Sequence, residues 1–321
     1  MPAVPTSSSS APAIVALGEA MLEFNQARAE APDAYLRGFG GDTSNMAIAA
    51  SRLAGPGRAG YVTRIGNDAF GRMLLDLWRQ EGVDTRGVAT DAEAPTGVYF
   101  VTHGPQGHEF SYLRAGSAAS RIGPDTLPLD TIRGARVLHV SGISQAISAS
   151  ACDAVFAAIE AAQAAGAAVS YDPNLRLKLW PPARARAIVM ATIAHCDWFL
   201  PALDEGKALS GQDDIEAIID WCHALGAPVV ALKCGSDGVV VSDGRRSERI
   251  TPHAVPSVDA TGAGDCFDGA FAVRVLAGDD PFAAARYANA AAALATTGYG
   301  AVAPLPRDAE VCALLAKERV A

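Results

Sequence analysis

Residues 258–267 (VDATGAGDCF) combine a glycine-rich turn with an acidic side chain at the start of an apolar helix pattern. The backbone N–H groups of Gly262, Ala263 and Gly264 would be unpaired at this helix start, where they can bind an anion with help from the helix dipole. Asp265 would repel a bound phosphate, so its carboxylate needs a task, and accepting a proton from an attacking hydroxyl is the natural one. The alternative is that Asp265 is an ordinary first-turn acid and that the glycines only close a turn.

A second glycine-rich segment, residues 38–45 (GFGGDTSN), leads into another helix pattern. Gly40 and Gly41 would let the backbone approach a ligand closely. Asp42 and Asn45 carry groups that hydrogen-bond to hydroxyls. The same residues also suit an ordinary helix N-terminus, so both interpretations stay open.

Two familiar phosphate-binding motifs are incomplete. Residues 206–208 (GKA) lack the Ser or Thr that ends a P-loop, so a P-loop enzyme is disfavoured. Residues 298–303 (GYGAVA) match the loose G-x-G-x-x-A dinucleotide pattern, but Pro304 and Pro306 forbid the helix that must follow. A dinucleotide oxidoreductase is therefore the weakest of the enzyme hypotheses.

The composition describes a chain that can build a large core, with 321 residues of which 50% are hydrophobic and 19% charged. The formal net charge is -9 and no basic stripe offsets it, so neither nucleic acid nor an anionic membrane surface is an expected partner. The alanine-rich stretches near 154–169 and 288–295 are too interrupted to span a membrane. We expect one large domain over 14–321, after a disordered tail at 1–13.

The cysteines are widely spaced, and no C-x-x-C pair occurs among positions 152, 196, 222, 234, 266 and 312. Their apolar neighbours are typical of buried, reduced thiols rather than of a zinc cage or a disulfide framework. The first 13 residues have neither a basic n-region nor an apolar h-region, unlike a secretion signal. We therefore expect a cytoplasmic protein.

These candidate groups need a scaffold, and short apolar runs alternate with helical patterns along most of the chain. The alternation predicts an α/β fold with a mostly parallel central sheet covered by helices on both faces. Strands are expected at 13–17, 59–63, 137–140, 167–171, 198–200, 229–232 and 238–242, and helices at 43–53, 69–80, 149–165, 183–194, 213–225, 262–276 and 281–297.

Two stretches, residues 20–39 and 97–113, break this alternation. In the second, apolar residues alternate with polar ones around a turn at 104–107, as in a half-exposed antiparallel hairpin. Ligands of doubly wound sheets bind at the carboxyl edge of the sheet. We therefore expect these strands to form a small β-sheet lid over that edge.

Together, these residues resemble the ribokinase-like (PfkB-type) carbohydrate kinases over nearly the whole chain after the tail. The resemblance implies that ATP binds on a doubly wound sheet and a sugar binds beneath a β-lid. It also implies that Asp265 is the catalytic base, and that the amides of residues 262–264 form the anion hole for the transferred phosphoryl group. The segments that carry it are GEAM at 18–21, GGDTSN at 40–45, KCGSDG at 233–238 and, above all, DATGAGD at 259–265.

Within this family, three stretches are most similar to 2-keto-3-deoxygluconate kinases, namely 17–25 (LGEAMLEFN), 110–119 (FSYLRAGSAA) and 171–176 (YDPNLR). Such a substrate carries a carboxylate, which planar guanidinium groups suit well. A lone arginine after a strand more often forms an ion pair, but two arginines in matching motifs favour a carboxylate site. The resemblance therefore places the following residues in the sugar site: Gly41, Asn45, Tyr99, Tyr112, Arg114, Arg176 and Asp265.

The resemblance also implies a nucleotide site and a magnesium ion. Many family members have Asn-x-x-Glu after the strand near Leu200, but this chain has Ala202 in place of the Asn. Glu205 remains, so Mg2+ is expected to be held mainly by ATP phosphates and water, with Glu205 acting indirectly. The sequence leaves open whether a monovalent cation binds near Asp259. The residues expected to border the nucleotide are Lys233, Gly235, Gly238, Gly262, Gly264 and Asn289.

The expected activity is phosphorylation of the 6-hydroxyl of 2-keto-3-deoxygluconate by ATP, giving 2-keto-3-deoxy-6-phosphogluconate. Another sugar kinase of the same fold, acting on fructose, ribose or a nucleoside, is the nearest alternative. A non-catalytic sugar or nucleotide sensor is the alternative from a different class. Lid edges in this fold often pair between subunits, so a homo-oligomer is expected.

Overall fold

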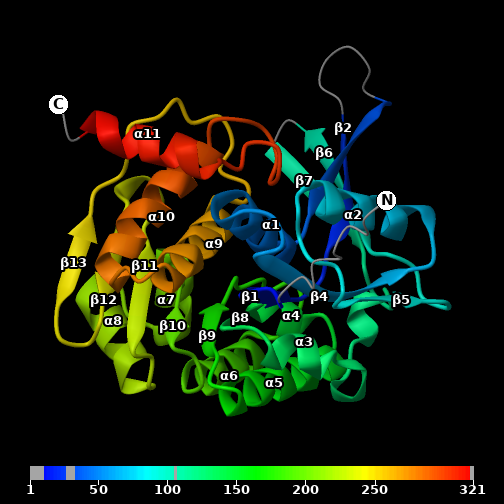
Figure 1. The fold of residues 1–321 in the computed structure, drawn as a ribbon, viewed down its shortest axis with the longest axis horizontal. Coiled ribbons are helices and arrows are strands. Elements are labelled where there is room, and N and C mark those ends of the chain that lie inside the picture. The colour runs from blue at the N-terminus through cyan, green and yellow to red at the C-terminus, as the bar shows by residue number, and fades with distance from the viewer. Residues whose placement is uncertain (1–10, 27–32, 105–106, 319–321) are drawn as a thin grey trace, which may run out of the picture.

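The computed structural model describes residues 11–26, 33–104 and 107–318 of the chain. A nine-stranded sheet runs through the middle of the molecule, and a separate four-stranded sheet stands at one end (Figure 1). This arrangement confirms the predicted α/β fold with a small second sheet. Residues 1–10 of the predicted tail lie outside the described residues.

The large sheet has the strand order β13-β12-β11-β10-β9-β8-β1-β4-β5. In this order, all strands from β11 to β5 pair in parallel, whereas β12 pairs antiparallel with both β11 and β13. The inner parallel strands are buried on both faces, which explains their continuous apolar sequences. The strands span Ile14–Leu17 (β1), Ala59–Gly66 (β4), Val88–Asp91 (β5), Val137–Ser141 (β8), Ala168–Asp172 (β9), Trp198–Phe199 (β10), Val229–Lys233 (β11), Val239–Ser242 (β12) and Ser247–Ile250 (β13).

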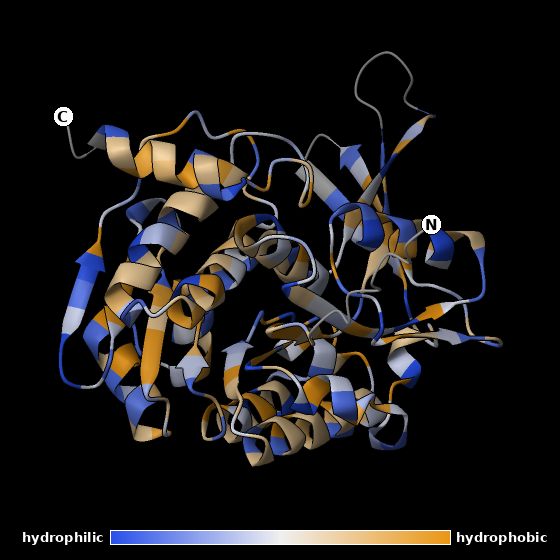
Figure 2. Ribbon diagram, viewed as in Figure 1, coloured by the Kyte–Doolittle hydropathy of each residue, from blue (hydrophilic) through white to orange (hydrophobic). Residues whose placement is uncertain are grey.

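Helices cover both faces of this sheet, and hydrophobic residues concentrate on the central strands and on the helix sides that face them (Figures 1 and 2). The helices span Asp42–Ala54 (α1), Ala69–Gln80 (α2), Leu129–Arg133 (α3), Gly142–Ala146 (α4), Ala149–Ala164 (α5), Pro182–Ile193 (α6), Leu203–Ser210 (α7), Ile215–Ala224 (α8), Ala263–Leu276 (α9), Pro281–Ala295 (α10) and Asp308–Glu318 (α11). One buried core contains side chains of α1, α9 and α10, and a second contains side chains of α5, α6 and α8.

Every strand and helix predicted for the large domain is present, with bounds close to those expected. The sequence patterns missed α3, α4, α7, α11, β5 and β13. Of these, α3 and α4 have 5 residues each, and β5 and β13 have 4. Segments this short contain too few apolar positions to show a period.

The second sheet has the strand order β3-β2-β6-β7 and uses the two stretches expected to form a lid. Its strands span Met21–Gln26 (β2), Tyr35–Gly40 (β3), Val98–Gly104 (β6) and Gly107–Leu113 (β7). The pairing of β6 with β7 is antiparallel, as predicted, and β6 also pairs in parallel with β2. Hydrophobic side chains remain exposed on this sheet at Tyr35, Leu36, Phe110, Tyr112 and Leu113.

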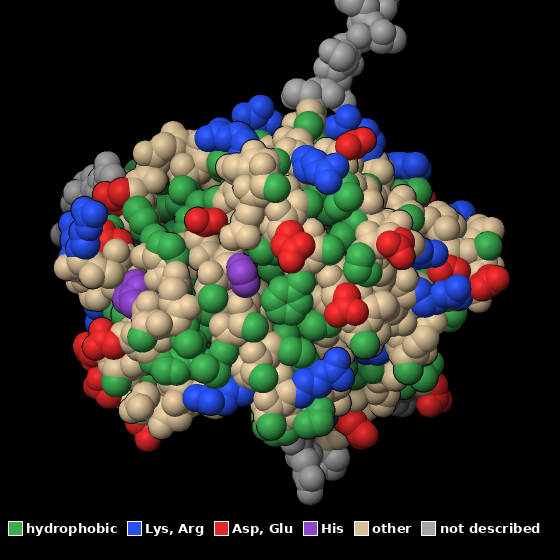
Figure 3. Space-filling view, turned by 90° about the horizontal axis from the view of Figure 1, so that it is seen from below, with side chains coloured by type: hydrophobic (Ala, Val, Ile, Leu, Met, Phe, Trp, Pro, Cys, Tyr) green, Lys and Arg blue, Asp and Glu red, His purple; other side chains and the backbone are tan. Residues whose placement is uncertain are grey.

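All six cysteines lie in the described part of the chain and are free. Four are buried, as predicted, and Cys234 is partly buried. The prediction is wrong for Cys312, which is exposed because it lies on the solvent side of α11. Among the described residues, no helix combines the length and the apolar character needed to cross a bilayer. On the face shown in Figure 3, basic and acidic side chains are interspersed.

The contact between α1 and α9 is unusually close. A Cβ atom added to Gly269 of α9 would lie 2.7 Å from the carbonyl oxygen of Met46 and 3.1 Å from the backbone nitrogen of Ala50, both in α1. Only glycine leaves room for the α1 backbone at this point. The first turns of the two helices, which carry Asn45 and Asp265, are thereby held against each other.

Replacing Gly269 with alanine should force α1 and α9 apart, because the new methyl group meets backbone rather than a flexible side chain. We expect Gly269→Ala to lower the free energy of unfolding by ~1–3 kcal/mol, measured by urea denaturation. Gly123→Ala is the control, since a Cβ there would lie 4.0 Å from its nearest neighbour, and it should change stability by less than about 0.5 kcal/mol. Wild-type stability of Gly269→Ala would contradict this account of the packing.

Candidate active site

Polar side chains from several elements meet where the parallel strands of the large sheet end. Asp172 is the last residue of β9, Lys233 is the last residue of β11, and Glu19 follows β1. The first turn of α1 joins them, because Asn174 Nδ2 donates a hydrogen bond to Asp42 Oδ2 at 3.0 Å. Parallel strands end at one edge of a sheet, where doubly wound folds bind their ligands.

Asp265, the predicted catalytic base, is partly buried in the first turn of α9. Asn45 Nδ2 donates a hydrogen bond to Asp265 Oδ2 at 2.8 Å. Burial and the Asp42 carboxylate raise the pKa of Asp265 to about 7, although the Asn45 bond and the Lys233 ammonium act in the opposite direction. A carboxyl group with this pKa is poised to accept a proton near neutral pH.

The turn before α9 has the geometry that an anion site needs. Gly262 is the N-cap residue with a φ of 77°, and a Cβ there would lie 2.9 Å from the carbonyl oxygen of Ala301. Within the described residues, the N–H groups of Gly262 and Gly264 have no hydrogen-bond partner, whereas Ala263 N donates to Ala260 O at 3.2 Å. Two of the three predicted amides are thus available to a ligand.

The predicted nucleotide residues lie at this turn, in the turn after β11 and on α10. Lys233 Nζ lies 3.5 Å from the position that a Cβ on Gly264 would take. Gly235 is exposed in a short 3-10 turn after β11, and Gly238, with a φ of 86°, ends that turn. Asn289 of α10 is buried, and its Nδ2 donates to a backbone carbonyl just after β13 at 2.8 Å.

Three residues at the centre of the site had no role in the sequence interpretation: Asp172, Asn174 and Asp268. Asn174 has a φ of 31°, which is rare for a residue other than glycine and marks a strained turn. Its backbone N–H donates to Asp172 Oδ1 at 2.9 Å, while its side chain bonds Asp42. The signal was present in the Asp-Pro-Asn sequence after β9, because this turn chemistry directs both polar side chains to the sheet edge.

The four-stranded sheet contributes Tyr99 and Tyr112, whose rings stack with centroids 5.6 Å apart. Tyr99 is buried, and its hydroxyl donates to the Glu23 carboxylate of β2. A Cβ on Gly40 would collide with the Tyr99 ring, and Gly41, with a φ of 118°, is the N-cap of α1. The predicted sugar residues of the sheet therefore lie over the chain that enters α1.

Arg114 follows β7 directly, at the base of the four-stranded sheet. Its guanidinium lies 5.6 Å over the ring of Tyr112 and forms an ion pair with Glu19, which also accepts a hydrogen bond from Ser117 Oγ at 3.0 Å. Glu19 is buried and Arg114 is largely buried, with exposed side-chain fractions of 1% and 11%. Arg114 Nε has no hydrogen-bond partner among the described residues. Arg114 is thus ion-paired and still offers an unpaired donor.

Arg176 and Glu205 lie side by side, with 3.9 Å between Nη1 and Oε1. The Arg176 side chain is 55% exposed, whereas Glu205 is buried. Both Glu205 carboxylate oxygens accept backbone hydrogen bonds, from Leu175 N at 2.7 Å and Ala202 N at 2.9 Å. Burial and the Asp172 carboxylate raise the pKa of Glu205 to about 7.

Asp259 connects the turn before α9 to the loop after α10. Its Oδ1 accepts a hydrogen bond from Thr261 N at 3.0 Å, and its Oδ2 accepts one from Gly300 N at 3.0 Å. The described segment 301–307 forms turns and loop rather than the helix that a dinucleotide motif requires. Gly298 to Gly300 therefore serve as a packing partner of the anion-binding turn.

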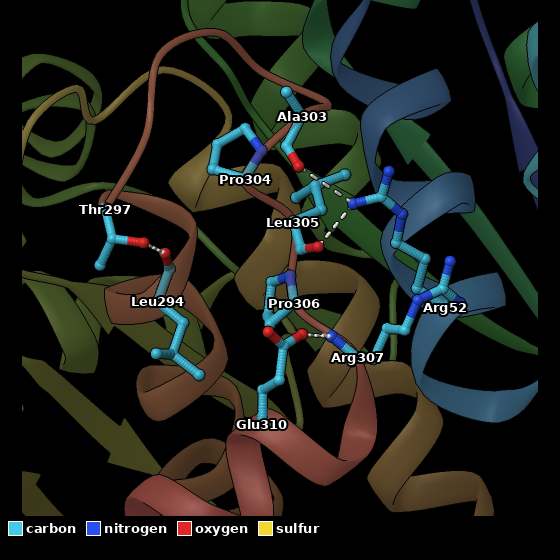
Figure 4. Close-up of a pocket in the computed structure, with 9 residues that line it drawn as sticks. All are labelled: Arg52, Leu294, Thr297, Ala303, Pro304, Leu305, Pro306, Arg307 and Glu310. Carbon is cyan, nitrogen blue, oxygen red and sulfur yellow. Dashed lines mark hydrogen bonds between the residues drawn. The ribbon is translucent and has the colours of Figure 1, made fainter.

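A pocket of about 370 Å³ lies elsewhere, between α1, α10 and the loop that leads to α11 (Figure 4). Arg52 of α1 projects into it and donates to Leu305 O at 2.5 Å, while its other nitrogens bond Glu81. None of the predicted site residues lines this pocket. Arg52 instead fastens the C-terminal end of α1 to the same loop that contacts Gly262.

Comparison with known proteins agrees with this geometry. Residues 11–308 match the family described as pfkB family carbohydrate kinase. The chain belongs to this family. Fructokinase-1 from Zea mays is 36% identical over 324 residues, which cover 95% of this chain and 98% of that protein. A 2-dehydro-3-deoxygluconokinase from Thermoproteus tenax is 35% identical over 308 residues, covering 92% and 93%.

Solved structures of the pfkB family share the fold. A double mutant of the fructokinase from Vibrio cholerae, in a fructose, ADP and potassium ion bound form, has a TM-score of 0.84 and 29% identity to this chain. The match covers 96% of this chain and 99% of that chain. The fold is therefore ribokinase-like and the chain is a carbohydrate kinase, as the resemblance implied.

In this pfkB kinase, Asp265→Asn should lower turnover by roughly 10²- to 10⁴-fold, the usual effect of losing a general base. The wild-type kcat/KM should rise about tenfold per pH unit up to about pH 7, because only the ionised carboxylate accepts a proton. Asp153→Asn, on the exposed side of α5, is the matched control and should change neither quantity. Near-normal turnover of Asp265→Asn would remove Asp265 from the role of base.

The same variant should be more stable than the wild type above neutral pH. A carboxyl group whose pKa is raised on folding contributes stability at low pH that is lost as pH rises through its folded-state pKa, here about 7. At pH 8 we expect the Tm of Asp265→Asn to exceed that of the wild type by about 2 °C or more, with the gap narrowing toward pH 5. A lower Tm at pH 8, measured by calorimetry, would contradict the proposed environment of the carboxylate.

Proposed function

We propose that this kinase transfers the γ-phosphoryl group of MgATP to the primary hydroxyl of a sugar acid of the 2-keto-3-deoxygluconate type. The observation that carries the phosphoryl transfer is the pairing of Asp265 with Asn45 beside two unpaired amides. The sugar hydroxyl oxygen forms the new bond to phosphorus, the bond from the γ-phosphorus to the bridging oxygen breaks, and ADP leaves. Asp265 takes the hydroxyl proton, and the amides of Gly262 and Gly264 stabilise the charge on the moving group.

The nucleotide would lie along Gly235, Gly238 and Asn289, with its terminal phosphate beside Lys233 and the anion-binding turn. Support comes from the ADP in the Vibrio cholerae relative, which shares this fold over nearly the whole chain. A Cβ on Gly235 would meet no atom within 4 Å, so the turn after β11 is open to a bound ligand there, whereas Gly238 packs against Ile250 O. This arrangement presents the terminal phosphate to Asp265.

A magnesium ion fits this site only if the phosphates of the bound nucleotide hold it. Among the described residues, no group of three or more His, Cys, Asp and Glu side chains could hold a metal ion. Glu205 has both oxygens engaged by backbone amides, and Ala202 offers no ligand, so Glu205 would act through water. Bound Mg2+ would neutralise phosphate charge and leave positioning to the protein.

A monovalent cation would bind where the loop 298–301 meets the anion-binding turn. Asp259 bridges these two segments, and the potassium ion in the Vibrio cholerae structure supports cation binding in a relative. Backbone carbonyls near Asp259 would supply oxygen ligands. An ion there would fix Gly262 against Ala301 and so hold the amides in place.

The four-stranded sheet would act as a lid over the sugar. Tyr99 and Tyr112 stack on its inner side near Gly41, and closure would exclude water that otherwise hydrolyses ATP. We also expect a homo-oligomer, supported by the exposed hydrophobic side chains that the same sheet carries.

The acidic substrate is supported by Arg114, a buried cation next to Tyr112 with an unpaired Nε donor. Because this donor is enclosed, a substrate carboxylate would bond it only after the neighbouring side chains shift, whereas the guanidinium of Arg176 is already exposed. Fructose is the second candidate. Fructokinases are as similar to this chain as the 2-dehydro-3-deoxygluconokinase is, and Glu19 already balances the charge of Arg114.

A substrate panel with ATP and a coupled ADP assay decides between them. Wild type should use 2-keto-3-deoxygluconate in preference to fructose, and Arg176→Ala should raise the KM for the acid by roughly 10- to 100-fold, as expected for a lost hydrogen bond to a charged group. The KM for fructose should change little, and Arg72→Ala, an exposed arginine of α2, should affect neither substrate.

Two other outcomes would contradict this proposal. Preference for fructose, with equal effects of Arg176→Ala on both sugars, would support the second candidate. Absence of ADP formation with any sugar would contradict the kinase proposal and favour a sensor.

A further inference from the structure

Lys233 is held between two carboxylates at the carboxyl end of β11. Its Nζ lies 2.9 Å from Asp172 Oδ2 and 3.1 Å from Asp268 Oδ1. The exposed fractions of the three side chains are 14% for Lys233, 7% for Asp172 and 1% for Asp268. Asp268 lies one turn beyond Asp265 in α9, so this ion cluster adjoins the proposed base.

The charges within the cluster balance when Asp268 carries a proton. Burial raises the pKa of Asp268 well above its ordinary value. Burial also acts to raise the pKa of Asp172, but the Lys233 ammonium and the hydrogen bonds from Lys233, Asp268 and Asn174 N together lower it. Burial disfavours the charged form of Lys233, but the carboxyl groups of Asp172, Asp268 and Glu205 together raise its pKa above the ordinary value. Lys233 is therefore a permanent cation, and the two acids hold it without adding net negative charge.

The position of Nζ leaves one of its donors for a ligand. An ammonium group has three N–H donors, and two of them are used by Asp172 and Asp268. Nζ lies 3.5 Å from the position of a Cβ on Gly264, whose amide is one of the two unpaired donors of the anion-binding turn. A side chain at 264 would cover the ammonium, and glycine leaves it open.

We propose that Lys233 is a catalytic residue whose third N–H donates to an oxygen of the phosphoryl group during its transfer, and that Asp172 and Asp268 are positioning residues. This inference rests on the proposed phosphoryl transfer. It adds the fixed positive charge of Lys233 to the two amide donors of the anion-binding turn. Donors held in place before the reaction need no reorganisation when charge develops, which makes them effective in catalysis. ADP lacks the transferred group, so its binding should not depend on this contact.

The first test compares Lys233→Met with wild type. We expect kcat to fall by about 10²- to 10³-fold, the usual effect of losing one donor to a developing charge. The affinity for ADP, measured by calorimetry, should change less than about threefold. Lys207→Met is the matched control, because Lys207 is a surface lysine of α7 paired with Asp213, and its kcat should equal that of wild type.

Removing Lys233 leaves Asp172 charged and buried, so Lys233→Met could fail to fold. The double variant Lys233→Met/Asp172→Asn keeps the cluster neutral and retains an oxygen for Asn174 N. It should fold, bind ADP and show the same loss of kcat. Retention of kcat within threefold in either variant, or equal losses of ADP affinity and kcat in both, would overturn the catalytic role.

Asp268 is tested by rescue. Asp268→Ala removes one anchor of Nζ and should lower kcat by about tenfold or more, whereas Asp268→Asn keeps an oxygen acceptor and should restore most of the loss. Equal kcat values for the two variants would contradict positioning by Asp268. If wild type itself forms no sugar phosphate, the proposed function fails. If wild type is active and Lys233→Met is equally active, only this inference fails.

Discussion

The hydrogen bond between Asn45 and Asp265 depends on how closely α1 and α9 approach each other. Gly269 lets the α1 backbone touch α9 one turn beyond the base, and this contact aligns the first turns of both helices at the sheet edge. Arg52, at the other end of α1, ties the helix to the loop that contacts Gly262. A shift of α1 would thus disturb the base and the anion-binding turn together, which makes this helix pair the constraint on which the site depends.

The scaffold was predictable where the sequence repeats a period over many residues. The helices α2 and α5 and the strands β8 and β9 lie where apolar periodicity placed them, since each buries a continuous stripe or run. The strands β5 and β13, with 4 residues each, could not be recognised in this way. Each of these strands forms because it pairs with a neighbouring strand at the edge of the sheet, and a local sequence pattern does not show which strand will be its neighbour.

The local part of the site was predictable, and the long-range part was not. Residues 259–265 form one turn whose glycines and acid can be interpreted together. The cluster of Lys233, Asp172 and Asp268 joins three separate elements, with Lys233 61 residues from Asp172. Likewise, Glu19 follows β1 and Arg114 follows β7, so their ion pair became visible only in the folded structure. Charge balance among buried groups is a property of the fold, because desolvation depends on all surrounding elements.

The residues proposed to bind the sugar and those proposed to transfer the phosphoryl group lie on different elements, which affects how the substrate selectivity of this protein could evolve. Tyr99 and Tyr112 lie in the small sheet and Arg114 directly follows it, whereas Lys233 ends a strand of the large sheet and Asp268 lies in α9, after the glycine turn. Substitutions in the small sheet could therefore alter which acceptor is recognised while the phosphoryl chemistry stays intact. The proposed sugar site also includes Arg176, which follows β9 of the large sheet, so exchange of the small sheet alone would transfer only part of the acceptor selectivity.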